Sequence, residues 1–400
     1  MQEIKGRYNF AKVFTDNIDS ETISQLYTLL NQMFVMNSRI RIMPDTHSGK
    51  GCVIGTTMTI KDKVVPNLVG VDIGCGVDVI KIDSKKIDFE KLDEVIRRTI
   101  PPYGMNIHEK AHRFSKDINL EELKCIKHVN QDRAINSIGT LGGGNHFIEI
   151  DVDNEGYYYV LIHSGSRYVG GQVAKYYQDL AVKNFNRDKV IKEKEDIIQQ
   201  LKSQEKTTEI QKALKKLKHP PQNPKDLMYV DGANFNDYIQ DMNMIQNYAK
   251  INRKAMADII LSNMGWKMKE YFSTIHNYID IENMILRKGA VSAQKGEKLV
   301  IPINMKDGAL ICIGKGNEDW NFSAPPHGAG RIFSRKEAKK VLSLEEFKTK
   351  MDGVWTSCVS QYTLDEAPMV YKPIDEIMKN IIDTVDVIDI IKPVYNFKAN

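Results

Sequence analysis

Val-Gly-Val-Asp-Ile-Gly-Cys-Gly-Val-Asp-Val, residues 69–79, is the stretch around which this chain is organised. It places two potential metal ligands, Asp72 and Cys75, three residues apart among glycines, which allow close approach of a ligand to the backbone. Apolar residues on both sides predict buried strands that lead into and out of a tight loop. The stretch therefore indicates a loop that presents a carboxylate and a thiol together. A glycine-rich turn with a merely buried cysteine is the alternative that this stretch alone leaves open.

Composition limits the class of protein. The chain has 400 residues, 42% of them hydrophobic, which suffices for a large core in one to three domains. A net charge of +4 is too small to establish nucleic-acid binding, so any basic surface must be local. Five scattered cysteines without a CxxC pair argue against a disulfide framework. The chain shows no signal-peptide core and no long apolar run, so we expect a cytoplasmic protein without a membrane span.

Hydrophobic spacing predicts one compact α/β body over residues 1–400. Helical spacing of apolar residues predicts helices over 16–38, 86–99 and 235–263, the last being the longest such pattern. Short apolar runs predict strands over 52–60, 76–82, 157–162, 298–303 and 309–313, and the tail from Thr384 alternates apolar and polar residues. Pro44 and nearby glycines predict a loop over 41–51. Ser343 with Glu346 fits a helix-capping box.

Residues 183–218, hereafter the basic segment, differ in character from their surroundings. They contain 11 Lys and Arg against 6 Asp and Glu, a net charge of +5. Their apolar residues recur at helical spacing, which predicts two helices folded back on each other as an inserted arm. Such a charge run is often only a solvated helical hairpin. The functional alternative is a surface that follows RNA phosphates.

Four histidines elsewhere in the chain are further candidate ligands. His146 follows three glycines, His163 ends a predicted strand, His276 precedes an asparagine, and His327 lies between two prolines and a glycine. Together with one carboxylate and one thiol, they form a donor set that suits Zn²⁺ or Mn²⁺. They exceed the four ligands of one closed site. Because a thiolate can bridge two ions, the set is compatible with a dinuclear centre that leaves one histidine for nucleophilic or acid–base work.

These motifs occur in an order that resembles the RtcB family of RNA ligases over nearly the whole chain. The matching segments are Met-Pro-Asp-Thr-His 43–47, Val-Gly-Val-Asp-Ile-Gly-Cys-Gly 69–76, Gly-Gly-Gly-Asn-His-Phe-Ile-Glu 142–149, His-Ser-Gly-Ser-Arg 163–167, His-Asn 276–277, His-Gly-Ala-Gly-Arg 327–331, Asp-Glu-Ala-Pro 365–368 and Lys398. The resemblance implies a distinctive α/β fold and a reaction that depends on Mn²⁺ and GTP. A histidine would be guanylylated, GMP would pass to an RNA 3′-phosphate, and a 5′-hydroxyl end would then expel GMP. A 2′,3′-cyclic phosphate end would be hydrolysed first.

The resemblance also implies roles for individual residues. Asp72, Cys75 and His146 would hold one Mn²⁺, and Cys75, His163 and His276 the other. His327 would be the guanylylated nucleophile. The residues expected around the guanylate are Asn145, His146, Phe147, Ile148, Glu149, His276, Asn277, Pro302, Ile303, Asn304, Met305, His327, Gly328, Ala329, Gly330, Tyr371 and Lys398.

The turn over residues 302–309 departs from the family pattern, because two serines expected near the nucleotide are Asn304 and Ala309. We therefore expect weaker or less guanine-selective nucleotide binding than is usual in the family. The expected partners are RNA with broken ends, such as tRNA, and an archease-type activating protein, with the chain itself a monomer. Two alternatives remain at this stage. They are a dinuclear metallophosphoesterase that hydrolyses RNA ends without joining them, and a non-catalytic protein that binds RNA ends.

Overall fold

The computed structural model describes residues 1–101, 107–203, 206, 209–215, 224–324 and 329–398. Two of the residues expected at the site, His327 and Gly328, lie outside the described residues. The same holds for parts of the basic segment, 204–205, 207–208 and 216–218. Within the described part of the chain, no helix combines the length and apolarity that a membrane crossing requires.

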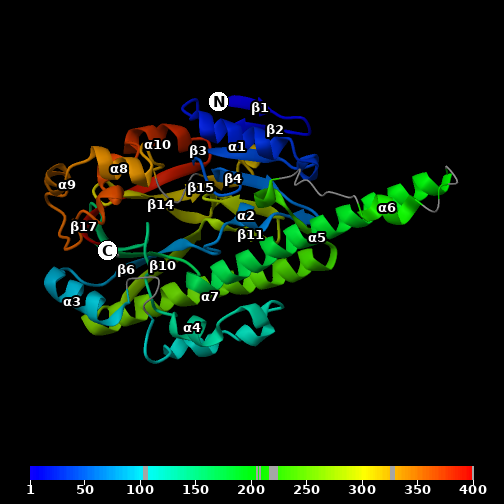
Figure 1. The fold of residues 1–400 in the computed structure, drawn as a ribbon. Coiled ribbons are helices and arrows are strands. Elements are labelled where there is room, and N and C mark those ends of the chain that lie inside the picture. The colour runs from blue at the N-terminus through cyan, green and yellow to red at the C-terminus, as the bar shows by residue number, and fades with distance from the viewer. Residues whose placement is uncertain (102–106, 204–205, 207–208, 216–223, 325–328, 399–400) are drawn as a thin grey trace.

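A seven-stranded antiparallel sheet forms the centre of the molecule (Figure 1). Its strands, in spatial order, are β10 (Met268–Ile275), β6 (Gly76–Ile82), β8 (Tyr158–Ser164), β7 (Phe147–Val152), β17 (Val385–Lys398), β15 (Gly308–Gly314) and β14 (Lys298–Asn304). Residues from both halves of this sheet share one apolar cluster, with Val79 and Leu161 from β6 and β8 meeting Val300 and Ile311 from β14 and β15. The sheet therefore curls so that its two halves face each other.

A second sheet of six strands lies beside the first. Its order is β1 (Gln2–Lys5), β2 (Phe10–Val13), β3 (Ile40–His47), β4 (Ile54–Thr59), β12 (Ile285–Lys288) and β11 (Asn277–Asp280), and only β2 and β3 run parallel. Two short pairs complete the strands, β5 (Lys63–Val64) with β9 (Val230–Asp231) and β13 (Val291–Ser292) with β16 (Ser323–Ala324). Strands β10 and β11 are almost continuous in sequence, so His276, the single residue between them, lies where the two sheets join.

The helices lie outside the two sheets (Figure 1). They are α1 (Ser20–Leu30), α2 (Pro66–Val69), α3 (Phe89–Thr99), α4 (Gln131–Asn136), α5 (Arg167–Ser203), α6 (Ile210–Lys215), α7 (Gly232–Met264), α8 (Arg335–Val341), α9 (Leu344–Lys350) and α10 (Ile374–Ile381). Helix α7 buries Met256 and Ile260 together with Ile148 and Ile162 of the central sheet. It lies side by side with α5, and α5 continues beyond the body of the molecule toward α6 (Figure 1). The expectation that residues 183–218 form an inserted arm stays a prediction.

Most predicted elements are present, with boundaries trimmed by local capping. The predicted helix 16–38 corresponds to α1 and a short 3₁₀ helix at Met33–Val35. Helix α1 begins after Asp19, because the Asp19 side chain caps it by accepting a hydrogen bond from the Thr22 amide. The predicted strand 76–82 is β6, and the capping box of Ser343 and Glu346 is confirmed. The predicted helix 235–263 is confirmed as α7, with 33 residues, and α5, with 37 residues, begins at Arg167, ahead of the segment where the first helix of the arm was predicted.

Two local predictions were wrong. The segment predicted as a loop at 41–51 contains β3, because residues 40–46 are buried between β2 and β4. Pro44 is tolerated there since the β3–β4 register is irregular between Ile42 and His47, where a ladder hydrogen bond is not required. The approach to the Asp72 loop is not a strand but the short helix α2, which starts at Pro66, a residue whose ring favours the first helical position.

Candidate metal centre and adjoining cavity

Three buried donors meet at one end of neighbouring strands. Cys75 directly precedes β6, His146 directly precedes β7, and His163 lies in β8, the strand between them. The register pairs His163 with Val77 on one side and with Phe147 on the other. Antiparallel pairing thus brings together residues that are far apart in sequence, and their donor atoms all lie within 4.8 Å of one another.

The thiol is the common neighbour of both imidazoles. Cys75 Sγ lies 3.4 Å from His146 Nε2 and 3.3 Å from His163 Nε2. Asp72 Oδ2 lies 3.0 Å from the same nitrogen of His146. The His276 ring is 5.2 Å from the His163 ring, centroid to centroid, and the His276 amide donates to Cys75 O. All five residues predicted as metal ligands are therefore gathered in one place.

Hydrogen bonding orients His163 as a ligand. Its Nδ1 lies 3.1 Å from the backbone carbonyl of Asn145, which can only accept a hydrogen bond. A neutral His163 consequently carries its proton on Nδ1 and turns the lone pair of Nε2 toward Cys75 Sγ. A backbone carbonyl that holds the outer nitrogen is a common way of fixing a metal-binding imidazole.

The donor set fits a divalent cation. Sulfur and nitrogen ligands of one tetrahedral ion would lie about 3.6 Å apart, given typical bonds of about 2.3 and 2.1 Å. The observed sulfur–nitrogen separations of 3.3 and 3.4 Å are close to this value. Burial and the adjacent Asp72 carboxylate raise the pKa of the Cys75 thiol well above its usual value. A cation at this place would favour the thiolate, the form in which cysteine binds metals.

The Asp72 carboxylate packs against Gly165, where no larger residue would fit. A Cβ on Gly165 would approach Asp72 Oδ1 to 2.2 Å, and the Ser166 amide donates to the same oxygen at 2.9 Å. Although burial raises the pKa of Asp72, the hydrogen bond with His146 and the charges of His146 and Arg167 outweigh it and leave the pKa below its usual range. Asp72 is therefore an ionised carboxylate in a fixed position, suited to bind a metal ion.

A cavity of about 580 Å³ adjoins this centre and includes His163 in its wall. Ten of the residues expected around a guanylate line it: Asn145, Phe147, Glu149, Pro302, Ile303, Asn304, Met305, Gly330, Tyr371 and Lys398. They come from segments spread over more than half of the chain, so the fold, not sequence proximity, brings them together. The volume lies within the range of small-molecule sites.

Other expected residues lie elsewhere. Ile148 is fully buried on the opposite face of β7, and Ala329 is fully buried in the core beneath α10. Asn277 braces the metal loop, since its Oδ1 accepts from the Gly289 amide at 3.0 Å and its Nδ2 donates to Asp72 O at 3.4 Å. His146 and His276 belong to the metal centre and not to the described cavity wall.

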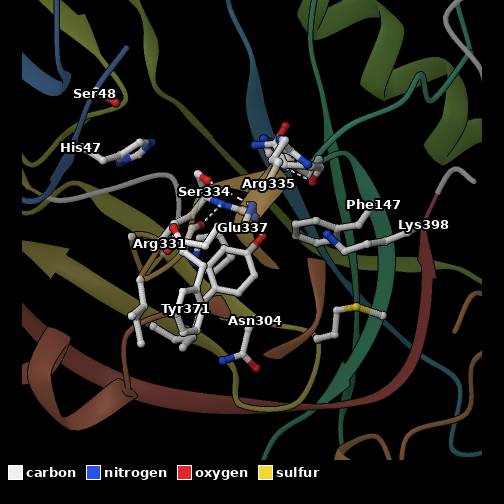
Figure 2. Close-up of a pocket in the computed structure, with 18 of the residues that line it drawn as sticks. His47, Ser48, Phe147, Asn304, Arg331, Ser334, Arg335, Glu337, Tyr371 and Lys398 are labelled. Carbon is white, nitrogen blue, oxygen red and sulfur yellow. Dashed lines mark hydrogen bonds between the residues drawn. The ribbon is translucent and has the colours of Figure 1, made fainter. Parts of the chain in front are cut away.

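Figure 2 shows that Arg331, Arg335 and Lys398 line the cavity, and each of these cationic side chains forms an ion pair with Glu366. Lys398 Nζ donates to Glu366 Oε2 at 2.7 Å, and Tyr371 Oη donates to the same oxygen at 2.6 Å. Arg331 and Arg335 contact the other carboxylate oxygen. Burial raises the pKa of Glu366, but Lys398 and Arg335 outweigh it and lower the pKa to about 2. This wall therefore offers guanidinium and ammonium groups that suit phosphate oxygens.

Sequence reasoning missed several residues of the cavity wall. Arg331 and Arg335 stand in the stretch His-Gly-Ala-Gly-Arg-Ile-Phe-Ser-Arg at 327–335, and their spacing after the glycines was a usable signal. Asn396 gave no signal, because it lies in an alternating strand. Its Nδ2 nevertheless donates to Glu149 Oε2 within the cavity wall. Burial raises the pKa of Glu149 to about 7, against the hydrogen bond from Asn396 and the charge of Lys398.

Comparison with known proteins agrees with this geometry. A family model described as tRNA-splicing ligase RtcB matches residues 25–399. The chain is 30% identical to RNA-splicing ligase RtcB of Escherichia coli strain K12, over 96% of this chain and 95% of that protein. It shows the same identity and coverage with RNA-splicing ligase RtcB1 of another Escherichia coli strain. It is 24% identical to tRNA-splicing ligase RtcB of Nanoarchaeum equitans, over 90% of this chain and 86% of that protein. The chain therefore belongs to the RtcB family and is an RNA ligase.

Proposed function

We propose that this enzyme joins RNA 3′-phosphate or 2′,3′-cyclic phosphate ends to 5′-hydroxyl ends, using GTP and two Mn²⁺ ions. The observation that carries the proposal is the position of the Cys75, His146 and His163 cluster directly beside the cavity of cationic and polar side chains. A metal centre next to a phosphate-binding wall is an arrangement suited to phosphoryl and nucleotidyl transfer.

In this proposal the chain's own residues divide the work. Asp72, Cys75, His146, His163 and His276 hold the ions, which supply charge neutralisation at phosphate. Arg331, Arg335 and Lys398 face the phosphates of GTP or RNA across the cavity. Glu149 accepts hydrogen bonds from the bound nucleotide at the buried end.

His327 is the proposed nucleophile. Its ring nitrogen attacks the α-phosphorus of GTP, a nitrogen–phosphorus bond forms, and the bond to the β-phosphate oxygen breaks with release of pyrophosphate. An oxygen of the RNA 3′-phosphate then takes the GMP and frees the imidazole. Finally, the 5′-hydroxyl oxygen bonds to the 3′-phosphorus and GMP leaves. A neutral imidazole is a competent nucleophile near neutral pH, and Gly330, three residues after His327, lines the cavity.

The setting of the reaction is also a proposal. We expect one catalytic domain over residues 1–400 with the basic segment 183–218 as an inserted arm that contacts RNA. The expected substrate is tRNA or another structured RNA with broken ends, in RNA repair or tRNA splicing in the cytoplasm. An archease-type protein is the expected activator, and the chain is expected to act as a monomer.

The test is incubation with GTP labelled at the α-phosphate and Mn²⁺, followed by denaturing electrophoresis. Wild-type protein should retain an acid-labile label, and His327→Ala should retain none while keeping its metal ions. His128→Ala, which alters an exposed histidine outside the described cavity wall, is the matched control and should label normally. Release of RNA end phosphate without labelling or joining would instead favour a dinuclear phosphoesterase. Binding of RNA ends without either reaction would favour a non-catalytic role.

A further inference from the structure

Two consecutive side chains of α7, Asn252 and Arg253, are completely buried behind the metal centre. A fully buried arginine is rare unless its charge is paired and all its donors are used. Neither side chain contacts a metal-ligand side chain through a described hydrogen bond. Both contact the backbone of the segments that carry those ligands.

Asn252 joins two of these segments. Its Oδ1 accepts from the amides of Gly139 and Thr140 at 2.8 and 3.1 Å, in the loop that leads to His146. Its Nδ2 donates to Ser164 Oγ at 3.2 Å and to Gly165 O at 3.1 Å, directly after His163. One amide group thus ties the approach to His146 to the exit from His163.

Arg253 joins the Cys75 loop to the same place. Its Nη1 donates to Gly74 O at 2.9 Å and to Ser164 O at 3.1 Å, the carbonyls next to Cys75 and next to His163. Its Nη2 donates to Ser273 Oγ at 3.3 Å, in the strand that ends before His276. The planar guanidinium can make these bonds at once because its donors have a fixed geometry.

Asp78 balances the buried charge of Arg253. Asp78 Oδ1 accepts from Arg253 Nε at 2.6 Å and from Ser273 Oγ at 2.6 Å, and Tyr271 Oη donates to Oδ2 at 3.1 Å. Both members of the ion pair have fully buried side chains. The pair is therefore neutral, and the three guanidinium nitrogens and both carboxylate oxygens each make at least one hydrogen bond, which favours a stable buried ion pair.

The ligand segments need such external support. Gly74, Gly139 and Gly165 have no side chains to hold them, and glycine has the widest conformational freedom of all residues. Helix α7 also packs closely on the Cys75 loop, since a Cβ on Gly74 would lie 2.8 Å from the Cα of Gln246. Metal coordination tolerates ligand displacements of only a few tenths of an ångström.

We propose that Asn252 and Arg253 are positioning residues that set the geometry of the metal centre by fixing its three ligand segments to one rigid helix. This inference rests on the proposed function, because it requires that the cluster binds divalent ions. It adds to that function a support in α7 that lies outside the ligand set and outside the described cavity wall.

The test compares two buried arginines that each pair with an aspartate. Arg253→Lys keeps the positive charge beside Asp78 but cannot reach both carbonyls with one planar group. Arg41→Lys is the matched control, since Arg41 is also buried and its guanidinium donates to Asp319 Oδ1 and to Ile40 O, each at 3.0 Å, with no described hydrogen bond to any of the five ligand segments. Mn²⁺ affinity of the metal-free full chain is measured by titration calorimetry, and the melting temperature without metal is measured in parallel.

We expect Arg253→Lys to weaken Mn²⁺ binding by about tenfold or more, as outer-shell substitutions typically do. Arg41→Lys should lower the metal-free melting temperature and leave Mn²⁺ affinity within about twofold of wild type. Equal Mn²⁺ affinity of Arg253→Lys and wild type, or an equal loss in Arg41→Lys, overturns the inference while the proposed function stands. Absence of Mn²⁺ binding by wild type overturns both. Asn252→Ser, which loses the reach to Gly165 O, decides the matter by the same criteria if Arg253→Lys does not fold.

Discussion

Cys75 is the residue on which the metal centre depends most, because its sulfur contacts both imidazoles. Cys75→Ala should reduce bound Mn²⁺ from the proposed two ions per chain to one or none and abolish ligation. The fold should remain, because alanine keeps a small apolar side chain at this buried position. Metal analysis of the purified variant, with circular dichroism as the folding control, measures this. Two bound ions in the variant would show that the thiol is not a shared ligand.

The buried carboxyl pair of Glu149 and Asp151 makes stability depend on pH. Burial and the neighbouring Glu149 raise the pKa of Asp151 well above its usual value, with Lys392 opposing the shift. Since a folded-state pKa above the unfolded one means that the folded chain holds the extra proton, this contribution favours folding at low pH. It is lost as pH rises through the folded pKa, at about 1.4 kcal/mol per pH unit for one group.

Asp151→Asn should therefore stabilise the protein more at pH 8.5 than at pH 5. The asparagine side chain is similar in size but has no carboxyl proton to lose. Urea denaturation of wild type and variant at the two pH values measures the difference in the free energy of unfolding. An equal change at both pH values would contradict the assignment of the pH dependence to this pair.

At the level of elements, the turn between β14 and β15 separates the two positions that depart from the family pattern. Asn304 lines the cavity, and its Oδ1 accepts from the amides of Lys306 and Asp307 at 2.9 Å each. Ala309 is fully buried in the apolar cluster between the halves of the central sheet and is not part of the described cavity wall. Only Asn304 is therefore placed to affect a bound nucleotide directly.

Single substitutions test this difference. Ala309→Ser should lower the free energy of unfolding by roughly 1–3 kcal/mol, because it buries a hydroxyl among apolar side chains, and should not tighten GTP binding. Asn304→Ser should alter the GTP concentration needed for half-maximal guanylylation, with ATP as competitor. Tighter GTP binding by Ala309→Ser would mean that this strand contacts the nucleotide after all.

The basic segment gives a prediction about RNA affinity. Four of its lysines are exposed on α5 and just beyond it: Lys183, Lys194, Lys202 and Lys206. Changing all four to glutamine should weaken RNA binding and flatten its dependence on salt, since fewer counterions are released. The control is the same change at four exposed lysines elsewhere: Lys5, Lys61, Lys85 and Lys379. Equal effects of the two quadruple variants would assign no special role to the segment.

For the whole molecule, metal binding should act as a fold stabiliser. The ligands come from residues 72–75, the residue before β7, strand β8 and the junction of β10 and β11, so the unfolded chain has no preformed site. A ligand at 100 times its dissociation constant stabilises the folded state by about 2.7 kcal/mol. Adding Mn²⁺ to chelator-treated protein should raise the melting temperature, and Cys75→Ala should lose this rise. If Mn²⁺ left the melting temperature of the wild-type protein unchanged, this would contradict a metal site that forms only in the folded state.

Local sequence patterns predicted helices, strands and motifs, but they could not predict which strands pair with each other. The alternation and apolar runs that mark β6 and β14 are properties of a few adjacent residues, so both strands were predicted close to their limits. The Pro44 segment was misread because its strand character comes from partners on both sides and not from its own residues. Asn252 and Arg253 gave no sequence signal, since their importance comes from backbone contacts more than 80 positions away.

At the site, too, local sequence patterns predicted the residue types but not how the fold brings them together. The histidines and the cysteine were recognisable because imidazole and thiol groups are typical metal ligands. Their meeting point follows from the order β6, β8, β7, which no local pattern specifies. The cavity wall was predicted in part from motifs, while Asn396, on an ordinary-looking strand, was found only in the folded molecule.

Strand β17 is an interior strand of the seven-stranded sheet, between β7 and β15. A ribosome makes β17 last of these seven strands, so during synthesis β7 and β15 each expose an unpaired edge. Exposed edges promote association between chains. Correct folding is therefore completed only after this strand emerges, and nascent chains need protection until then. A premature stop codon before Val385 would remove this interior strand and Lys398 together, so the truncated product should be inactive and open to proteolysis.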